Sequence, residues 1–209
     1  MKMRVLTLAS ALKSCFLIAI ASYLGAACSP SFEGTYSDPA KAEIVDDKWN
    51  ETDAQKTANN LINAVLSKPW LKVYKSSKKR RPVVIVDDIT NRTDEHIDTK
   101  ALFEFVQDEL INSGKVRFVN NKRRQQILDE IKYQNSGAVS GRTSKKSGRQ
   151  TGADFMLGGA ISSSVHTQGG LKTVTYQTSL TLTDIETAEI VWSGKKIIKK
   201  RFKRSGAGW

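Results

Sequence analysis

The segment that constrains the fold most is residues 173–182, in which inward and outward side chains alternate. The inward half consists of Val174, Tyr176, Thr178, Leu180 and Leu182. A period of two residues predicts a β-strand with one buried face. Gly169-Gly170, just ahead of the segment, predicts a hairpin turn from a preceding strand over residues 155–165.

Three further segments are predicted strands. After a turn, residues 190–198 form a returning strand in which Ile190 and Trp192 are in phase. Residues 82–87 are a continuous apolar run, typical of a central strand covered on both faces. Residues 116–119 form a short strand.

Apolar residues at helical spacing predict helices between the strands. The first helix begins at Thr52-Asp53 and ends at Lys68-Pro69, because a residue before proline rarely continues a helix. The other predicted helices are residues 99–113 with Asp98 or Thr99 as cap, residues 121–133 with a stripe of Ile127, Leu128 and Ile131, and a short helix from Thr143 or Ser144 to Thr151. The element order predicts an α/β fold (an α+β sandwich), in which helices pack on one mixed β-sheet.

The N-terminus has the organisation of a bacterial export signal that ends in a lipidated cysteine. Three basic residues and no acidic residue precede an apolar core over residues 15–24, which is too short to cross about 30 Å of hydrocarbon as a helix. Small residues at 25–27 then precede Cys28, whose thiol would accept a diacylglyceryl group. Simple export with ordinary cleavage, or a buried core helix, are the alternatives.

Four segments are therefore predicted. Residues 1–27 are a signal peptide, 28–49 the lipidated N-terminus and a short linker, 50–200 the folded domain, and 201–209 a basic C-terminal tail. About twenty linker residues reach at most about 66 Å when extended and about 25 Å as a flexible coil. We therefore expect the domain to stay close to its membrane. Ser29 is not the aspartate that typically retains lipoproteins in the inner membrane of enteric bacteria, which favours the outer membrane.

The charge of the chain indicates an acidic partner. The 209 residues carry a formal net charge of +12, and the signal accounts for three of these cations. For an exported protein, this charge favours anionic lipid, cell-wall polymer or an acidic protein surface over nucleic acid. Because Cys15 lies in the signal and Cys28 carries the lipid, no thiol remains for a disulfide or a cysteine-based metal site.

The sequence shows no arrangement of residues typical of an active site. The polar loop predicted over residues 88–95 belongs to an acidic cluster, Asp87 to Asp98, that includes His96 and could bind a divalent cation. It has neither EF-hand spacing nor an H-E-x-x-H pattern, so a capping loop is the better interpretation. We expect a binding module without catalytic residues, cofactor or metal.

Four blocks of sequence follow one another within residues 50–200. They are RPVVIVDDITNRTDEHID over 81–98, LINSGK over 110–115, GADFML over 152–157 and ETAEIVWS over 186–193. Together, behind a lipidation signal, they resemble the peptidoglycan-synthase activator LpoB family. The family usually has glycine where Ala188 stands here.

This resemblance implies a fold similar to the N-terminal domain of TolB. It implies an outer-membrane lipoprotein, anchored through Cys28 and facing the periplasm, that is not itself an enzyme. The implied partner is a class A penicillin-binding protein, whose glycosyltransferase and transpeptidase activities the lipoprotein stimulates. The alternative is a lipoprotein component of another envelope assembly, for secretion or surface-appendage export, that uses the same fold.

Three basic loops are the candidate partner contacts, each with a plain solvated surface as the alternative. Their residues are Lys78, Lys79, Arg80, Arg81, Lys122, Arg123, Arg124, Arg142, Lys145, Lys146 and Arg149. The run Lys199–Arg204 places five cations around Phe202. At about 1 kcal/mol per cation near an anionic surface, this tail could bind anionic lipid or peptidoglycan. A frayed terminus is the alternative.

Overall fold

The computed structural model describes residues 34, 36, 38, 41 and 46–203. The predicted signal peptide, Cys28, the linker up to residue 45 apart from residues 34, 36, 38 and 41, and residues 204–209 lie outside the described residues. Within the described part, none of the helices combines the length and the hydrophobicity needed to cross a bilayer.

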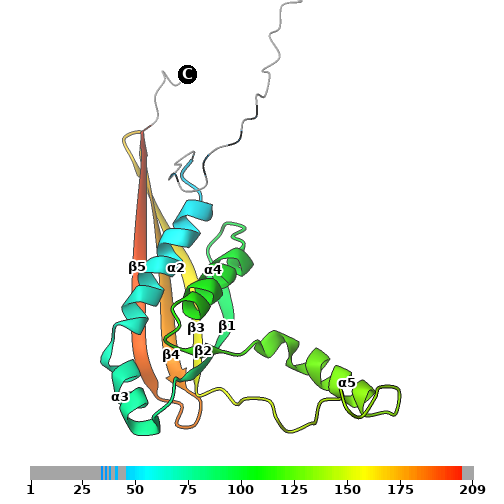
Figure 1. The fold of residues 1–209 in the computed structure, drawn as a ribbon. Coiled ribbons are helices and arrows are strands. Elements are labelled where there is room, and N and C mark those ends of the chain that lie inside the picture. The colour runs from blue at the N-terminus through cyan, green and yellow to red at the C-terminus, as the bar shows by residue number, and fades with distance from the viewer. Residues whose placement is uncertain (1–33, 35, 37, 39–40, 42–45, 204–209) are drawn as a thin grey trace, which may run out of the picture. The chain divides into compact units, whose positions relative to one another are not determined.

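Five strands form one mixed sheet in the order β2-β1-β3-β4-β5 (Figure 1). The strands are β1 Val83–Arg92, β2 Arg117–Phe118, β3 Phe155–Gln168, β4 Leu171–Asp184 and β5 Ile190–Lys203. Strand β1 runs parallel to both β2 and β3, whereas β3, β4 and β5 form an antiparallel meander. The predicted mixed sheet is confirmed, while the comparison with TolB stays a prediction.

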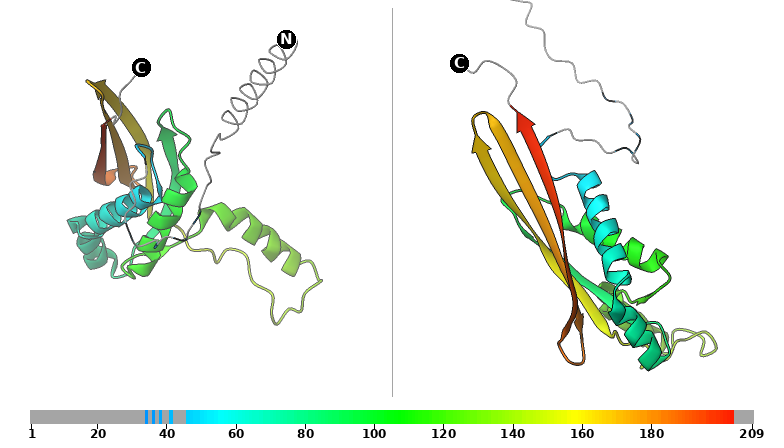
Figure 2. Two further views of the ribbon diagram at one scale, coloured as in Figure 1. Left: turned by 90° about the horizontal axis from the view of Figure 1, so that it is seen from above. Right: turned by 90° about the vertical axis from the view of Figure 1, so that its left-hand side faces the viewer.

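The described helices are α2 Glu51–Leu66, α3 Pro69–Lys78, α4 Thr99–Asn112 and α5 Arg124–Gln134, with a 3₁₀ turn η1 over Asn121–Arg123. In Figure 2 (right), α2 and α4 lie against the same side of the sheet, and no described helix covers the other side. The α+β fold class is therefore confirmed.

The core lies between α2, α4 and the helix-facing side of the sheet. The inward half of β4 is fully buried, and the alternation predicted for this strand is confirmed. The six predicted inward residues of α2 are also buried: Ala54, Ala58, Leu61, Ile62, Val65 and Leu66. Gly159 of β3 permits close packing, because a Cβ there would lie 2.1 Å from the backbone oxygen of Ser179 in β4.

The first helix begins earlier than predicted, because its cap is Asn50. The Asn50 side chain accepts a hydrogen bond from the Asp53 amide at 3.0 Å, and the Asp53 carboxylate accepts one from the Asn50 amide at 3.1 Å. This reciprocal pair is a capping box, so Asp53 is its third helical residue rather than the cap. For α4, the predicted cap Asp98 is confirmed.

Two predictions about β1 are wrong. The polar residues after Asp87 do not begin a loop, because β1 continues to Arg92 and pairs with β3 beyond a register shift between Val86 and Ile89. The prediction that β1 is covered on both faces is correct only at the start of the strand. There, Val83 and Val84 point to opposite faces and both are buried. Further along, Asp87 is exposed, because no described helix covers its face.

The helix predictions also need three corrections. Pro69 does not simply end a helix but starts α3 as its first residue, where its missing amide proton costs nothing. The short helix predicted up to Thr151 is absent, and the chain forms turns there. The third predicted helix exists as η1 and α5, but its stripe is only partly buried. Ile131 is buried while Ile127 is exposed, because α5 lies apart from the sheet (Figure 1).

Strand β5 also differs from its prediction. Trp192 is buried but Ile190 is exposed, because a register shift at Leu182/Thr183 of β4 breaks their common phase. The strand continues to Lys203, so residues 201–203 of the predicted tail belong to the sheet rather than to a frayed terminus. Lys200 is buried.

Candidate functional site

Basic residues gather where three strands of the sheet begin. Strand β1 runs parallel to its neighbours β2 and β3, so the amino-terminal ends of the three strands lie at the same end of the sheet. The segments that precede β1 and β3 bring Arg80, Arg81 and Asp154 to this end of the sheet, and β2 itself begins with Arg117. We call this region, with Thr151 to Asp154 at its centre, the basic end.

Arg80 is held at the basic end by a two-point ion pair. Its Nη1 and Nη2 lie 2.8 and 2.7 Å from the two carboxylate oxygens of Asp154. The Asp154 carboxylate also accepts a hydrogen bond from the Val83 amide at 2.7 Å. Partial burial acts to raise the pKa of Asp154, but these donors outweigh burial and lower that pKa below its ordinary value. Arg80 therefore joins the starts of β1 and β3.

Helix α3 packs against this ion pair. The Arg80 guanidinium lies 5.4 Å from the centre of the Tyr74 ring, a cation–π arrangement. Trp70 and Tyr74 both meet Phe155 of β3 edge-on, at centroid distances of 5.1 and 5.3 Å. Burial, with the nearby Asp154 carboxylate, raises the pKa of Tyr74 to about 12. The aromatic contacts fix α3 on the sheet.

Other candidate residues also bond within the domain. Arg81 donates to the Gly114 carbonyl at 3.0 Å, and Arg124 donates to the Thr151 carbonyl at 3.0 Å. Lys122 forms an ion pair with Asp88 and lies 4.1 Å from the centre of the Phe103 ring. The structure thus brings the first two basic loops to the basic end and its flank, where these side chains hold segments together.

The remaining candidates have unengaged side chains. Among the described residues, these side chains form no hydrogen bond or ion pair: Lys78, Lys79, Arg123, Arg142, Lys145, Lys146 and Arg149. The last four belong to the loop after α5. This loop is tied to α5 through its backbone, because the Lys145 amide donates to Gln134 at 2.9 Å.

The entry of the chain into the domain forms a second ordered cluster, which sequence reasoning assigned to the linker. The Tyr176 hydroxyl donates to Glu95 at 2.6 Å and lies 3.0 Å from the Asp47 carbonyl oxygen. Burial is the main cause that raises the pKa of Tyr176, and the hydrogen bond to the Glu95 carboxylate raises this pKa further. The Trp49 ring packs on Tyr176 with centroids 5.5 Å apart. Asp47 is paired with Lys172, which lowers the pKa of Asp47.

A buried ion pair completes this cluster. Lys200 Nζ lies 2.6 Å from Asp53 Oδ2, with side-chain exposures of 3% and 9%. Lys200 also donates to the Lys48 carbonyl. The ordered domain thus includes residues 47–49. Trp49, an isolated aromatic residue in a polar segment, was the signal that could have shown this.

Three members of the acidic cluster considered as a cation site have partners within the domain. Asp88 pairs with Lys122, Glu95 accepts from Tyr176, and Asp98 caps α4. Among the residues that the structure describes, no group of three or more His, Cys, Asp or Glu side chains is placed to hold a metal ion.

Comparison with known proteins adds the family. Residues 53–198, from the first turn of α2 to the middle of β5, match the profile of the peptidoglycan-synthase activator LpoB. The chain belongs to the LpoB family. Ala188 has a positive φ of 61°, a backbone conformation that glycine adopts more readily than alanine.

Relatives with known names include the penicillin-binding protein activator LpoB of Escherichia coli (strain K12). It is 27% identical over 121 residues, which are 57% of this chain and 53% of that protein. The chain thus spans about half the length of the curated relatives it matches. The LpoB C-terminal domain from Salmonella enterica aligns with a TM-score of 0.41 and 20% identity, covering 70% of this chain and 98% of that chain. The corresponding domain from Escherichia coli aligns with a TM-score of 0.41 and 23% identity over the same shares.

Proposed function

We propose that this chain binds and activates a penicillin-binding protein and thereby regulates peptidoglycan synthesis. The observation that carries the proposal is the family match, which spans residues 53–198. This range includes α2 from its third residue, every later helix of the described domain and all strands up to the middle of β5. The curated relatives are named for the same activity. The chain then acts as a binding protein rather than an enzyme.

The partner we propose is a class A penicillin-binding protein. An activator shifts its partner toward the active conformation only if it binds that conformation more tightly than the inactive one. A rigid surface favours such selection, and the basic end is braced by the Arg80–Asp154 ion pair and the aromatic contacts of α3. The domain thus offers a surface whose shape need not change on binding.

Contact with the synthase is assigned to the cations that have no partner in the domain. Lys78 and Lys79 border the basic end. Arg123 lies near it because the next residue, Arg124, donates a hydrogen bond to the Thr151 carbonyl. An acidic surface on the synthase would be attracted to them, mainly through a faster association rate. Arg80, Arg81, Lys122 and Arg124 instead maintain the shape of this surface.

The anchor we propose is a lipid on Cys28, in the outer membrane, with the domain facing the periplasm. Labelled palmitate is expected to enter the wild-type protein, and labelling that persists after Cys28→Ala would refute the site. The exposed cations of β5, Lys199, Arg201 and Lys203, are proposed as a secondary contact with anionic lipid or peptidoglycan.

A pull-down from solubilised envelope tests the choice of partner. The protein is expected to recover a class A penicillin-binding protein, and Lys78→Glu/Lys79→Glu should reduce the recovery. Lys56→Glu/Lys100→Glu is the matched control, because both lysines are exposed and unpaired on helices away from the basic end. Recovery of secretion components without any penicillin-binding protein would favour the alternative envelope assembly.

A further inference from the structure

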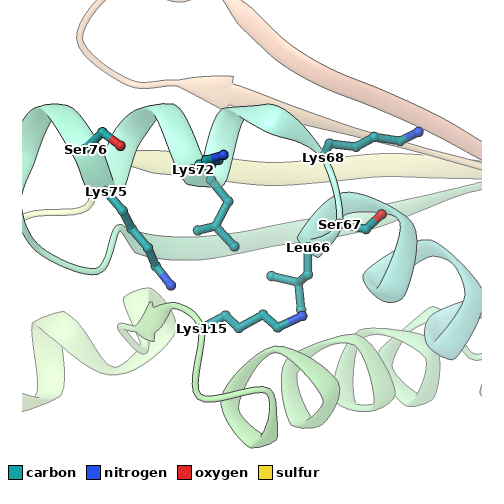
Figure 3. Close-up of a pocket in the computed structure, with 8 residues that line it drawn as sticks. Leu66, Ser67, Lys68, Lys72, Lys75, Ser76 and Lys115 are labelled. Carbon is teal, nitrogen blue, oxygen red and sulfur yellow. The ribbon is translucent and has the colours of Figure 1, made fainter.

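A hollow of about 460 Å³ lies where α2 ends and α3 begins. Its far wall is the loop after α4 (Figure 3). Its lining includes four lysines and two leucines: Lys68, Lys72, Lys75, Lys115, Leu66 and Leu71. The volume falls within the range of small-ligand sites, about 300–1,000 Å³.

The lysines around this hollow are unpaired. Lys68 is the N-cap of α3, Lys72 and Lys75 lie in its first two turns, and Lys115 belongs to the loop after α4. Figure 3 shows Lys75 and Lys115 reaching into the space between these two elements. In residues 46–203, the ammonium groups of these four lysines form no ion pair or side-chain hydrogen bond. No carboxylate lines the hollow.

Fold stability does not account for this arrangement. Like charges at neighbouring helical turns repel one another and weaken a helix slightly. An anion between α3 and Lys115 would replace the repulsion by attraction. The floor of the hollow is apolar, since Leu66 and Leu71 are buried there, so the site can also accept an uncharged part of a ligand.

The type of cation indicates the type of anion. Every cation in the hollow is a lysine, whose ammonium is a point charge with three donors, suited to the oxygens of phosphate. The hollow contains no arginine, whose planar fork would match a carboxylate in two-point geometry. Ser76 adds a hydroxyl at the rim, and no partner in the described domain engages it.

We propose that this hollow binds a phosphate group, carried either by a soluble phosphate compound or by the headgroup of an anionic lipid. The site is separate from the lipid on Cys28 and does not depend on the proposed activation of a synthase. Each lysine is worth about fivefold in affinity for an anionic lipid surface, so removing two of them should weaken binding about 30-fold.

The test compares two double variants of the purified protein that lose the same charge. Lys75→Gln/Lys115→Gln removes cations from the hollow, and Lys100→Gln/Lys195→Gln removes exposed, unpaired lysines on α4 and β5. All four side chains are exposed, so both variants should keep the wild-type melting temperature. Binding of pyrophosphate is measured by calorimetry, and binding to phosphatidylglycerol vesicles is measured by sedimentation, with phosphatidylcholine vesicles as reference.

The outcomes separate the two sources of phosphate. Pyrophosphate binding that falls about 30-fold in the Lys75/Lys115 variant alone supports a soluble ligand. Vesicle binding that falls in the same variant alone, without pyrophosphate binding, supports a lipid headgroup. Equal losses in both variants would show attraction by net charge and overturn the proposal. Binding of neither probe, or equally tight binding of tetraglutamate, would also overturn it.

Discussion

Replacing Lys200 by methionine should destabilise the domain severely. Lys200 and Asp53 are 3% and 9% exposed in their side chains, and their charged atoms lie 2.6 Å apart. Methionine fills most of the lysine volume, so the change removes a charge without a large cavity. The Asp53 carboxylate then stays buried without its cation, and the Lys48 carbonyl loses the Lys200 ammonium as a donor.

The expected cost is about 3 kcal/mol. Removing one partner of a buried ion pair costs about 3–5 kcal/mol, and Asp53 still accepts the Asn50 amide, which places the loss at the lower end. Natural domains have only about 5–15 kcal/mol of stability, so such a loss is easily measured. Urea unfolding followed by tryptophan fluorescence reports it, because Trp49 lies beside this cluster.

The neighbouring residue supplies the control. Lys199 is exposed and points to the other face of β5, so Lys199→Met should change stability by less than about 0.5 kcal/mol. The double variant Asp53→Asn/Lys200→Met should lose less than the sum of the two single variants, because no unpaired charge remains buried. A loss below about 1 kcal/mol for Lys200→Met, or an equal loss for Lys199→Met, would refute the buried pair.

Three other substitutions test separate features. Asp154→Asn should lower the free energy of unfolding by only about 1–2 kcal/mol at pH 7, because the Arg80 side chain that it pairs with is half exposed to solvent. Because the folded-state pKa of Asp154 is lowered, this contribution is present above about pH 4 and disappears as the pH falls through the folded pKa; a wild-type-to-variant gap in urea titrations that does not shrink as the pH is lowered below about 4 would contradict it. Gly159→Ala should cost about 1–3 kcal/mol by overpacking, whereas Gly158→Ala, whose Cβ would meet its nearest atom at 3.6 Å, should cost less than about 1; equal losses in thermal unfolding would be inconsistent with the close approach. Ala188→Gly should stabilise the protein by about 1 kcal/mol, because Ala188 has φ of 61°, and a lower melting temperature would count against that strain.

The parts of the fold that were predictable are those in which local patterns and burial agree. The alternation along β4 determines which of its faces is buried, since a shift by one residue would bury the polar side chains instead. The apolar stripe of α2 likewise fixed its buried face. The predicted phase failed at two places: at the register shift in β5 that exposes Ile190, and in α5, where Ile127 is exposed because this helix lies apart from the sheet.

The missing parts depend on partners distant in sequence. The basic residues of β5 look like a tail until Lys200 meets Asp53 and Lys48 across the domain. Helix α3 was missed because Pro69 was interpreted as a stop. Its position at the start of a helix and the spacing of Lys68, Lys72 and Lys75 were the available signals. The hollow also needs Lys115, which only tertiary structure brings opposite α3.

The central claim is activation of a peptidoglycan synthase. The most direct test is the rate of glycan-strand synthesis by the cognate class A penicillin-binding protein, measured with increasing amounts of the purified protein. The rate is expected to rise and saturate, with Lys78→Glu/Lys79→Glu needing a higher concentration for half of the effect. An unchanged rate at a concentration at which binding to the synthase is saturated would contradict the account.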